Sequence, residues 1–124
     1  MINKETRLPI SDNSDAQIVL CIHTNKKRQK LKKTSLGNFI KATIKRRVYK
    51  RNTLKKRVNW VLVGATKRKI QRLSGESIKF NSIKATVVDE KRAKTMGSRI
   101  KGVLPKELGR YNLNDIVSKA RRLI

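Results

Sequence analysis

The side chains best suited to catalysis are few in this sequence and poorly grouped. Cys21 and His23 are the only cysteine and the only histidine. Alternation along a strand would place them on one side, but two ligands do not complete a zinc site. A packed thiol beside a surface or RNA-facing histidine is the simpler interpretation. We therefore expect no metal site, no cofactor and, with one cysteine, no internal disulfide and a reducing compartment.

The acidic residues and the glycines give no catalytic pattern either. The 8 carboxylates are scattered, and the adjacent Asp89 and Glu90 would point apart on a strand or turn. Gly97 and Gly102 have the spacing of a phosphate-binding loop, but Val103 follows where that loop requires a lysine. A turn with positive φ explains these glycines better. We expect a protein that is not an enzyme.

The signal that remains is positive charge. The 124 residues include 33 Lys and Arg against 8 Asp and Glu, a formal net charge of +25. The cations gather in blocks at residues 26–33, 45–57, 67–72 and 91–101. Lysine and arginine bind phosphates as point charges and as bidentate forks, and a charge of this size repels itself unless a polyanion lies nearby. The blocks predict contacts with the backbone of folded RNA.

The residues assigned to RNA binding are the cations of the first three blocks together with Tyr49, whose ring could stack on an unpaired base. Taken alone, any one of these lysines is better explained as a solvated surface charge. The set as a whole argues for a polyanionic partner. Its members are Lys26, Lys27, Arg28, Lys30, Lys32, Lys33, Lys45, Arg46, Arg47, Tyr49, Lys50, Arg51, Lys55, Lys56, Arg57, Lys67, Arg68, Lys69 and Arg72.

Short strands separated by turns must position these side chains. Alternation and β-branched residues predict strands at residues 7–10, 16–23, 39–45, 58–65, 77–80 and 84–89. Polar and glycine-containing segments predict turns at residues 12–15 and 74–76. Apolar residues with helical spacing predict an amphipathic helix over residues 113–124, with Asn112 as its N-cap, after a helical turn at residues 105–108.

These elements are typical of a mainly β protein, a small antiparallel β-barrel with a C-terminal helical region. The length suits one domain, with the barrel at about residues 1–104 and the helical region at about residues 105–124. In the strand at residues 58–65, Trp60 and Leu62 share one face and Val61 and Val63 the other. We expect one face to line the barrel and the other to pack on the tail helix or a partner.

No apolar run reaches the roughly 18 to 20 residues that span a bilayer, and residues 1–6 carry no stretch of signal-peptide length. We therefore expect no membrane span. Either a targeting segment has been removed, or the protein is made where it works.

Several segments resemble, in order and spacing, the universal large-subunit ribosomal protein fourteen. The resemblance covers nearly the whole chain and implies a five-stranded barrel with a C-terminal helical region. The segments that carry it are Asp12-Asn13-Ser14, Val19-Leu20-Cys21-Ile22, Leu36-Gly37-Asn38-Phe39-Ile40, Thr66-Lys67-Arg68, Gly75-x-Ser77-Ile78-Lys79-Phe80, Gly97-Ser98-Arg99-Ile100-x-Gly102 and Ile116-Val117-Ser118.

The resemblance also implies a function. A protein of this family is a structural constituent of the large ribosomal subunit, in contact with large-subunit rRNA and neighbouring ribosomal proteins. Members lie on the intersubunit face and bridge to small-subunit rRNA, and in bacteria and organelles the ribosome silencing factor docks on the same region. The matching motifs carry Ser98, Arg99 and Ser118 over to that face, and we place Lys119, Arg121 and Arg122 beside them.

The chain departs from the family pattern at several positions, and these departures bear on its compartment. They are Asp15, Asn38, Ile83, Lys84, Val103 and Asp115, the last in place of a lysine of the silencing-factor face. Lys, Ile and Asn make up a third of the chain, which suggests AT-rich coding. Together these features predict a divergent mitochondrial member, with a plastid or the bacterial cytoplasm as the alternative. A free basic nucleic-acid-binding or chaperone protein is the other function left open.

Overall fold

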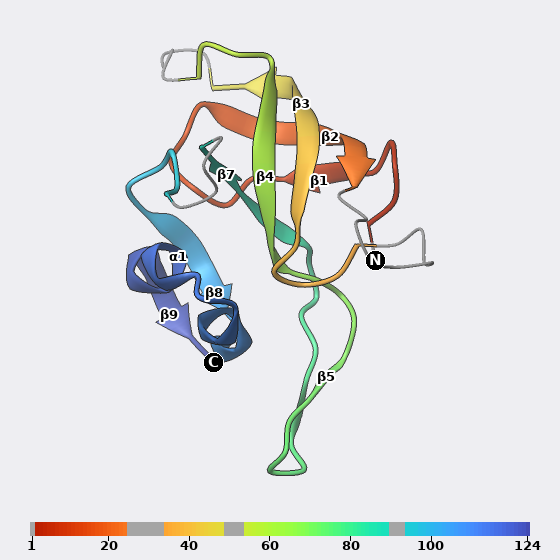
Figure 1. The fold of residues 1–124 in the computed structure, drawn as a ribbon, viewed down its shortest axis with the longest axis vertical. Coiled ribbons are helices and arrows are strands. Elements are labelled where there is room, and N and C mark those ends of the chain that lie inside the picture. The colour runs from red at the N-terminus through yellow and green to blue at the C-terminus, as the bar shows by residue number, and fades with distance from the viewer. Residues whose placement is uncertain (1, 25–33, 49–53, 90–93) are drawn as a thin grey trace.

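A curled antiparallel sheet forms the larger part of the molecule (Figure 1). The structure, a computed structural model, describes residues 2–24, 34–48, 54–89 and 94–124. Five strands pair in the order β1-β2-β3-β4-β7. Their bounds are β1 Arg7–Pro9, β2 Ala16–Thr24, β3 Phe39–Arg47, β4 Val58–Ala65 and β7 Lys84–Val88. Five of the six strands predicted in the first 89 residues are thus confirmed in place, although several are shifted at their ends, and the sixth, predicted at residues 77–80, extends only over Ser77–Ile78.

The two edge strands of the sheet curl toward each other. Ser11 N–H donates to the Ala85 carbonyl at 2.9 Å, and Ile10 forms an isolated parallel bridge with Ala85. An isolated bridge joins these two edges, whereas each pair of neighbouring strands within the sheet is joined by a ladder of several residue pairs. The described strands therefore form a half-barrel, and the full closure that the sequence predicted is not seen in them.

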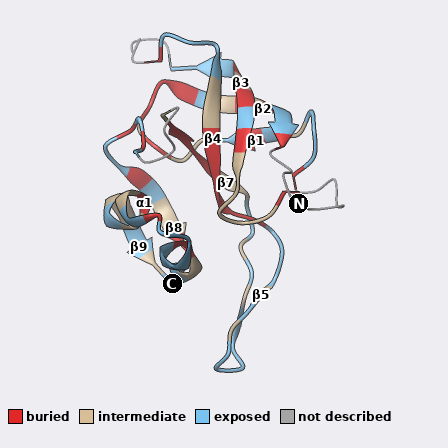
Figure 2. Ribbon diagram, in the orientation of Figure 1, coloured by how far each residue is buried: buried red, intermediate tan, exposed pale blue. Residues whose placement is uncertain are grey.

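The inner face of the half-barrel holds the first hydrophobic core. On β3, Ile40, Ala42 and Ile44 are buried while Lys41 and Lys45 are exposed, which confirms the predicted alternation (Figure 2). Leu8, Val19, Val61, Val63 and Val87 complete the cluster from the other strands. This arrangement leaves the outer face of β3 basic.

A β-bulge in β2 separates Cys21 from His23. Cys21 pairs with Ala42, but His23 pairs with Lys41, so the register shifts between them. An extra residue in one strand reverses the alternation of its side chains. Cys21 is therefore buried, with its thiol pKa raised by desolvation, while His23 is exposed. The expectation that both lie on one side was wrong. Within the described ranges, no group of three or more His, Cys, Asp and Glu could hold a metal ion.

A narrow hairpin projects away from the sheet (Figure 1). It is built from β5, Ile70–Gln71, and β6, Ser77–Ile78. Arg72 N–H donates to the Glu76 carbonyl at 2.9 Å, and Gly75 has φ +87° at the tip. This backbone conformation strains any residue with a side chain, which explains the glycine of the predicted turn.

The C-terminal region is a second, smaller unit. β8, Ile100–Leu104, pairs in parallel with β9, Ala120–Leu123. The connection contains η1, a 3-10 helix over Lys106–Tyr111, and α1, Asn114–Lys119. None of the helices in the described segments is long and apolar enough to span a membrane.

The helix predicted over residues 113–124 is wrong beyond Lys119. Ala120 is already extended, and the chain continues as β9 because the edge of β8 supplies backbone partners. Local spacing carries no information about that distant edge. Asn112 is also not the N-cap of α1: it ends η1 in the left-handed region, with φ 57°, and Leu113 occupies the cap position.

A second hydrophobic core lies between this unit and the sheet. Leu62 and Val88 from the sheet pack in it with Ile100, Leu104, Leu108, Leu113 and Ile116. Because Val61 and Val63 lie in the first core, β4 contributes side chains to both. The prediction that one face of β4 lines the barrel and the other packs on the tail is confirmed.

Candidate nucleic-acid interface

Two loops that are far apart in sequence meet beside the seam of the half-barrel. The side-chain oxygen of Asn13 accepts hydrogen bonds from the backbone N–H groups of Ser98 at 2.8 Å and Arg99 at 3.2 Å. Its amide nitrogen donates to Ser98 Oγ at 2.8 Å. A Cβ at Gly97 would lie 2.7 Å from the Asn13 oxygen, so only glycine allows this approach. The contact fixes the backbone from which Arg99 extends.

Asp12 fixes the loop that carries Asn13. Its carboxylate accepts from the backbone N–H groups of Ser14 and Val87, each at 2.9 Å, and from the Ser14 hydroxyl. Burial raises the pKa of Asp12, while the hydrogen bonds from Ser14 and Val87 act in the opposite direction. The bond to Val87 ties the loop to β7, so the predicted turn at residues 12–15 is anchored in the sheet.

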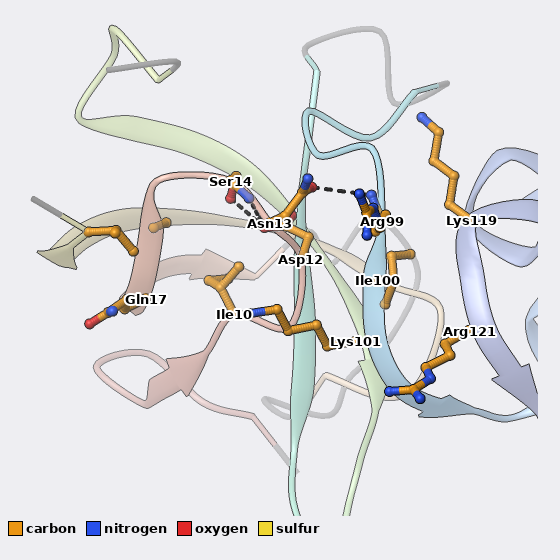
Figure 3. Close-up of a pocket in the computed structure, with 12 residues that line it drawn as sticks. Ile10, Asp12, Asn13, Ser14, Gln17, Arg99, Ile100, Lys101, Lys119 and Arg121 are labelled. Atoms are coloured by element: carbon orange, nitrogen blue, oxygen red, sulfur yellow. Dashed lines mark hydrogen bonds between the residues drawn. The ribbon is translucent and has the colours of Figure 1, made fainter. Parts of the chain in front are cut away.

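A groove of about 1110 Å³ runs between these loops and the C-terminal unit. Arg99, Lys101, Lys119 and Arg121 line it, as Figure 3 shows. Ile100 pairs with Ala120 in the parallel register of β8 and β9. The register then shifts before Val103, so the ladder does not pair Lys101 directly with Arg121, but both exposed side chains line the groove.

The cations of the groove differ in what they contact. Lys119 Nζ donates to Asp115 Oδ2 at 3.0 Å and to Thr95 Oγ1 at 2.8 Å. The backbone N–H of Thr95, more than Lys119, holds the pKa of Asp115 below its ordinary value. Arg99, Lys101 and Arg121 form no ion pair within the part of the chain that the structure describes. Three neighbouring cations without an acidic partner favour an anionic ligand.

Comparison with known proteins identifies the family of the chain. The profile of the family described as "Ribosomal protein L14p/L23e" matches residues 1–124. The chain belongs to this family. It is 30% identical over 124 residues to the "Large ribosomal subunit protein uL14c" of Cuscuta obtusiflora, covering 100% of both chains. The protein of the same description from Cuscuta gronovii has the same identity and coverage. The chain is thus a ribosomal protein and not an enzyme.

The remaining residues assigned to the intersubunit face of this L14-family protein lie close to the groove or on α1 and β9. Ser98 is exposed in the loop held by Asn13, and Ser118 is exposed on α1, where its hydroxyl donates to the Asp115 carbonyl at 2.8 Å. Arg122 is exposed on β9 and alternates with Arg121 along the strand. Lys101 belongs to the cationic block at residues 91–101 but was not assigned to this face, and it also lines the groove.

The cations assigned to rRNA binding are spread over several elements of this L14-family fold. The exposed ones on the sheet and hairpin are Lys45 and Arg46 on β3, Lys55, Lys56 and Arg57 before β4, and Lys67, Arg68 and Lys69 before β5. Nine further members lie outside the described residues: Lys26, Lys27, Arg28, Lys30, Lys32, Lys33, Tyr49, Lys50 and Arg51.

Two arginines of the rRNA-binding set contact groups within the chain. Arg47 donates to the Leu54 carbonyl at 2.8 Å and lies 3.8 Å from the buried carboxylate of Asp15. Arg72 Nε donates to Glu107 Oε1 at 2.6 Å, and its guanidinium also bonds the Ile124 carbonyl. The Arg72 hydrogen bond is the main cause that lowers the pKa of Glu107. Arg72 therefore links the hairpin to the C-terminal unit.

Proposed function

We propose that this protein, as a single ribosomal-protein domain, binds large-subunit rRNA and contributes to a bridge with small-subunit rRNA during translation. The observation that carries the proposal is the groove that Arg99, Lys101 and Arg121 line without an acidic partner among the described residues. Guanidinium and ammonium groups on one face suit the closely spaced phosphates of folded RNA. Membership in a ribosomal protein family supports this interpretation.

We assign the contacts with the large and the small subunit to two different surfaces. The exposed cations of β3, of the segment before β4 and of the hairpin would bind large-subunit rRNA. The groove and the exposed residues of α1 and β9 would face the small subunit. Leu73 is 98% exposed at the hairpin tip, where an apolar side chain suits contact with a neighbouring large-subunit protein.

The groove is also the place where the ribosome silencing factor would dock. Asp115 replaces the lysine expected there, yet Lys119 and Thr95 hold its carboxylate. The negative charge is therefore neutralised within the chain, and the face keeps Ser98, Arg99 and Ser118 exposed. A factor that presents carboxylates would meet the same cations as the RNA.

The compartment is part of the proposal. Abundant Lys, Ile and Asn and the departures from the family pattern support a mitochondrial large subunit. The two relatives are plastid proteins, which supports the plastid alternative. Hybridisation of the coding sequence to separated mitochondrial, plastid and nuclear DNA tests the two, and a plastid signal would overturn the mitochondrial assignment.

Replacing Arg99 tests the division of surfaces. The Arg99→Ala protein should enter large subunits normally but impair their joining to small subunits, because the groove loses a phosphate-binding cation. Sucrose-gradient sedimentation of lysates reports both steps. Arg110→Ala, which removes an exposed cation from η1, is the matched control and should leave joining unchanged. Failure of the Arg99 variant to enter large subunits would place Arg99 in the rRNA-binding face instead. Unmodified protein at the top of the gradient would favour the free nucleic-acid-binding alternative.

A further inference from the structure

A second, smaller cleft lies where β4 begins, and none of its lining residues belongs to the groove. It has a volume of about 350 Å³ and is lined by Lys41, Val58, Trp60, Asp89 and Met96, with Lys55 and Lys56 beside them. We call it the Trp60 cleft. Its volume is at the lower end of the range for small-molecule sites. It can hold one planar group but not a paired stem.

The floor of the Trp60 cleft is aromatic and apolar. Trp60 is half-buried and packs on the second core, which fixes the orientation of its ring. Lys41 pairs with Trp60 across β3 and β4, and its Nζ lies 5.0 Å from the ring centroid. Val58 and Met96 are each 47% exposed beside the ring. A rigid indole edged by exposed apolar side chains is suited to stacking with a planar group.

The rim of the cleft determines the charge of its occupant. Lys41, Lys55 and Lys56 are all exposed, and Asp89 is the single acidic residue of the lining. This excess of positive charge disfavours a cationic side chain, although aromatic rings otherwise attract cations. An occupant with a flat apolar face and negative charges beside it fits both the aromatic floor and the cationic rim. An unpaired nucleotide of RNA has that combination.

We propose that the Trp60 cleft holds one unpaired RNA nucleobase, stacked on Trp60, while the lysines of the rim bind its neighbouring phosphates. This rests on the proposed RNA-binding function and gives it a second contact of a different kind. Lys41 is the mobile component, because a long side chain can move from the ring to a phosphate as the base enters. The protein would then recognise an unstacked base in addition to the RNA backbone.

Asp89 gives the cleft a preference among bases. Its Oδ1 is buried and has no hydrogen-bond donor within the described residues. The last torsion of an aspartate is broad, so the carboxylate can turn toward an occupant. Two oxygens side by side match two adjacent N–H donors, which guanine alone among the standard bases presents on its Watson–Crick edge. The cleft is therefore expected to prefer guanine.

Trp60 is the only tryptophan of the chain, so its fluorescence reports directly on the cleft. The whole protein is titrated with an RNA hexamer of uridines containing one guanine, with an all-uridine hexamer, and with polyphosphate of similar charge. Stacking quenches the indole, so we expect quenching by both hexamers, tighter binding of the guanine hexamer, and binding of polyphosphate without quenching. Asp89→Asn should abolish the preference for guanine.

Variants separate the cleft from general RNA binding. Trp60→Leu should weaken hexamer binding about 10-fold and leave polyphosphate binding unchanged. Met96→Glu, at the exposed rim, should also weaken hexamer binding and leave polyphosphate binding unchanged, because Met96 is not part of either core. Ile124→Ala, at an exposed apolar residue that lines neither the groove nor the cleft, is the neutral control. Binding of RNA and polyphosphate with equal affinity and no quenching would overturn the proposal that a base stacks in the cleft, but not RNA binding. The cleft would then be better explained as a site for a side chain of a partner protein. Absence of RNA binding altogether would overturn both.

Discussion

The half-barrel and the C-terminal unit bury their apolar side chains in different ways. In the half-barrel, every continuous ladder is antiparallel and the alternation of each strand defines a buried face. In the C-terminal unit, two short strands pair in parallel, and a 3-10 helix and a one-turn-and-a-half α-helix fill the connection. The half-barrel has its own core, whereas the C-terminal unit uses side chains of the sheet to complete the second core.

This difference shows that the smaller unit depends on the larger one. Two parallel strands alone cannot bury an apolar face, so β8 and β9 require the outer surface of β4 and β7. Leu62 and Val88 supply that surface. The cationic groove lies between the C-terminal unit and the loop at residues 12–14, so the proposed bridge to the small subunit depends on the attachment of the C-terminal unit.

Removing Leu62 should have the largest effect on this attachment. Leu62 is 0% exposed in the second core, and Leu62→Ala should lower the free energy of unfolding by about 2 to 5 kcal/mol. Urea unfolding measures the loss, and hydrogen exchange should show β8 and β9 losing more protection than β3. A loss within about 0.5 kcal/mol, as expected for the exposed control Leu73→Ala, would mean that the two regions are not coupled through Leu62.

Asp12 joins the loop at residues 12–14 to the sheet, and its removal should have an intermediate effect. Asp12→Ala leaves the buried N–H of Val87 without an acceptor, which costs about 1 to 3 kcal/mol. Asp12→Asn keeps an acceptor oxygen and should lose much less. Thermal unfolding of the two variants checks this order. Equal losses would show that the carboxylate charge matters more than the hydrogen bond to Val87.

The link between Arg72 and Glu107 should give the smallest effect, visible as a dependence on pH. The pKa of Glu107 is lower in the folded protein, so its contribution is present above the unfolded pKa of about 4.3 and disappears as the pH falls through the folded value. Glu107→Gln should therefore lower the urea midpoint at pH 7, and the difference should shrink toward pH 3. Glu5→Gln, at an exposed carboxylate that belongs to neither the hairpin nor η1, is the matched control. A difference that stays constant with pH would show that the carboxylate charge of Glu107 does not stabilise the fold.

Local patterns predicted the strands of the half-barrel, though not its open seam, because the relevant information lies within each strand. Ile40, Ala42 and Ile44 alternate with polar residues, and Gly75 marks the hairpin turn. The same reasoning failed for residues 120–123, since their conformation depends on β8, some twenty residues earlier. It also failed at Cys21 and His23, because the bulge arises from the pairing of β2 with β3.

The sequence predicted which residues belong to the candidate site, but not how the fold brings them together. Charge alone identified the cations, and the motif around Ser98 and Arg99 indicated one loop of the groove. That Asn13 holds this loop, and that Lys101 and Arg121 line one groove, depends on contacts across the fold. The sequence also could not show that Arg72 contacts Glu107, a contact that only the docking of the hairpin region on η1 creates.

The position of Leu62 has a consequence for how the chain matures during synthesis. All five strands of the half-barrel have been made once Val88 has been added, but the residues that cover Leu62 extend to residue 116 and beyond. At the usual elongation rates this interval lasts on the order of seconds. During that time a folded sheet would present an uncovered apolar stripe on β4 and β7. A sheet that folds in this interval is prone to aggregation through that stripe until the C-terminal unit packs on it.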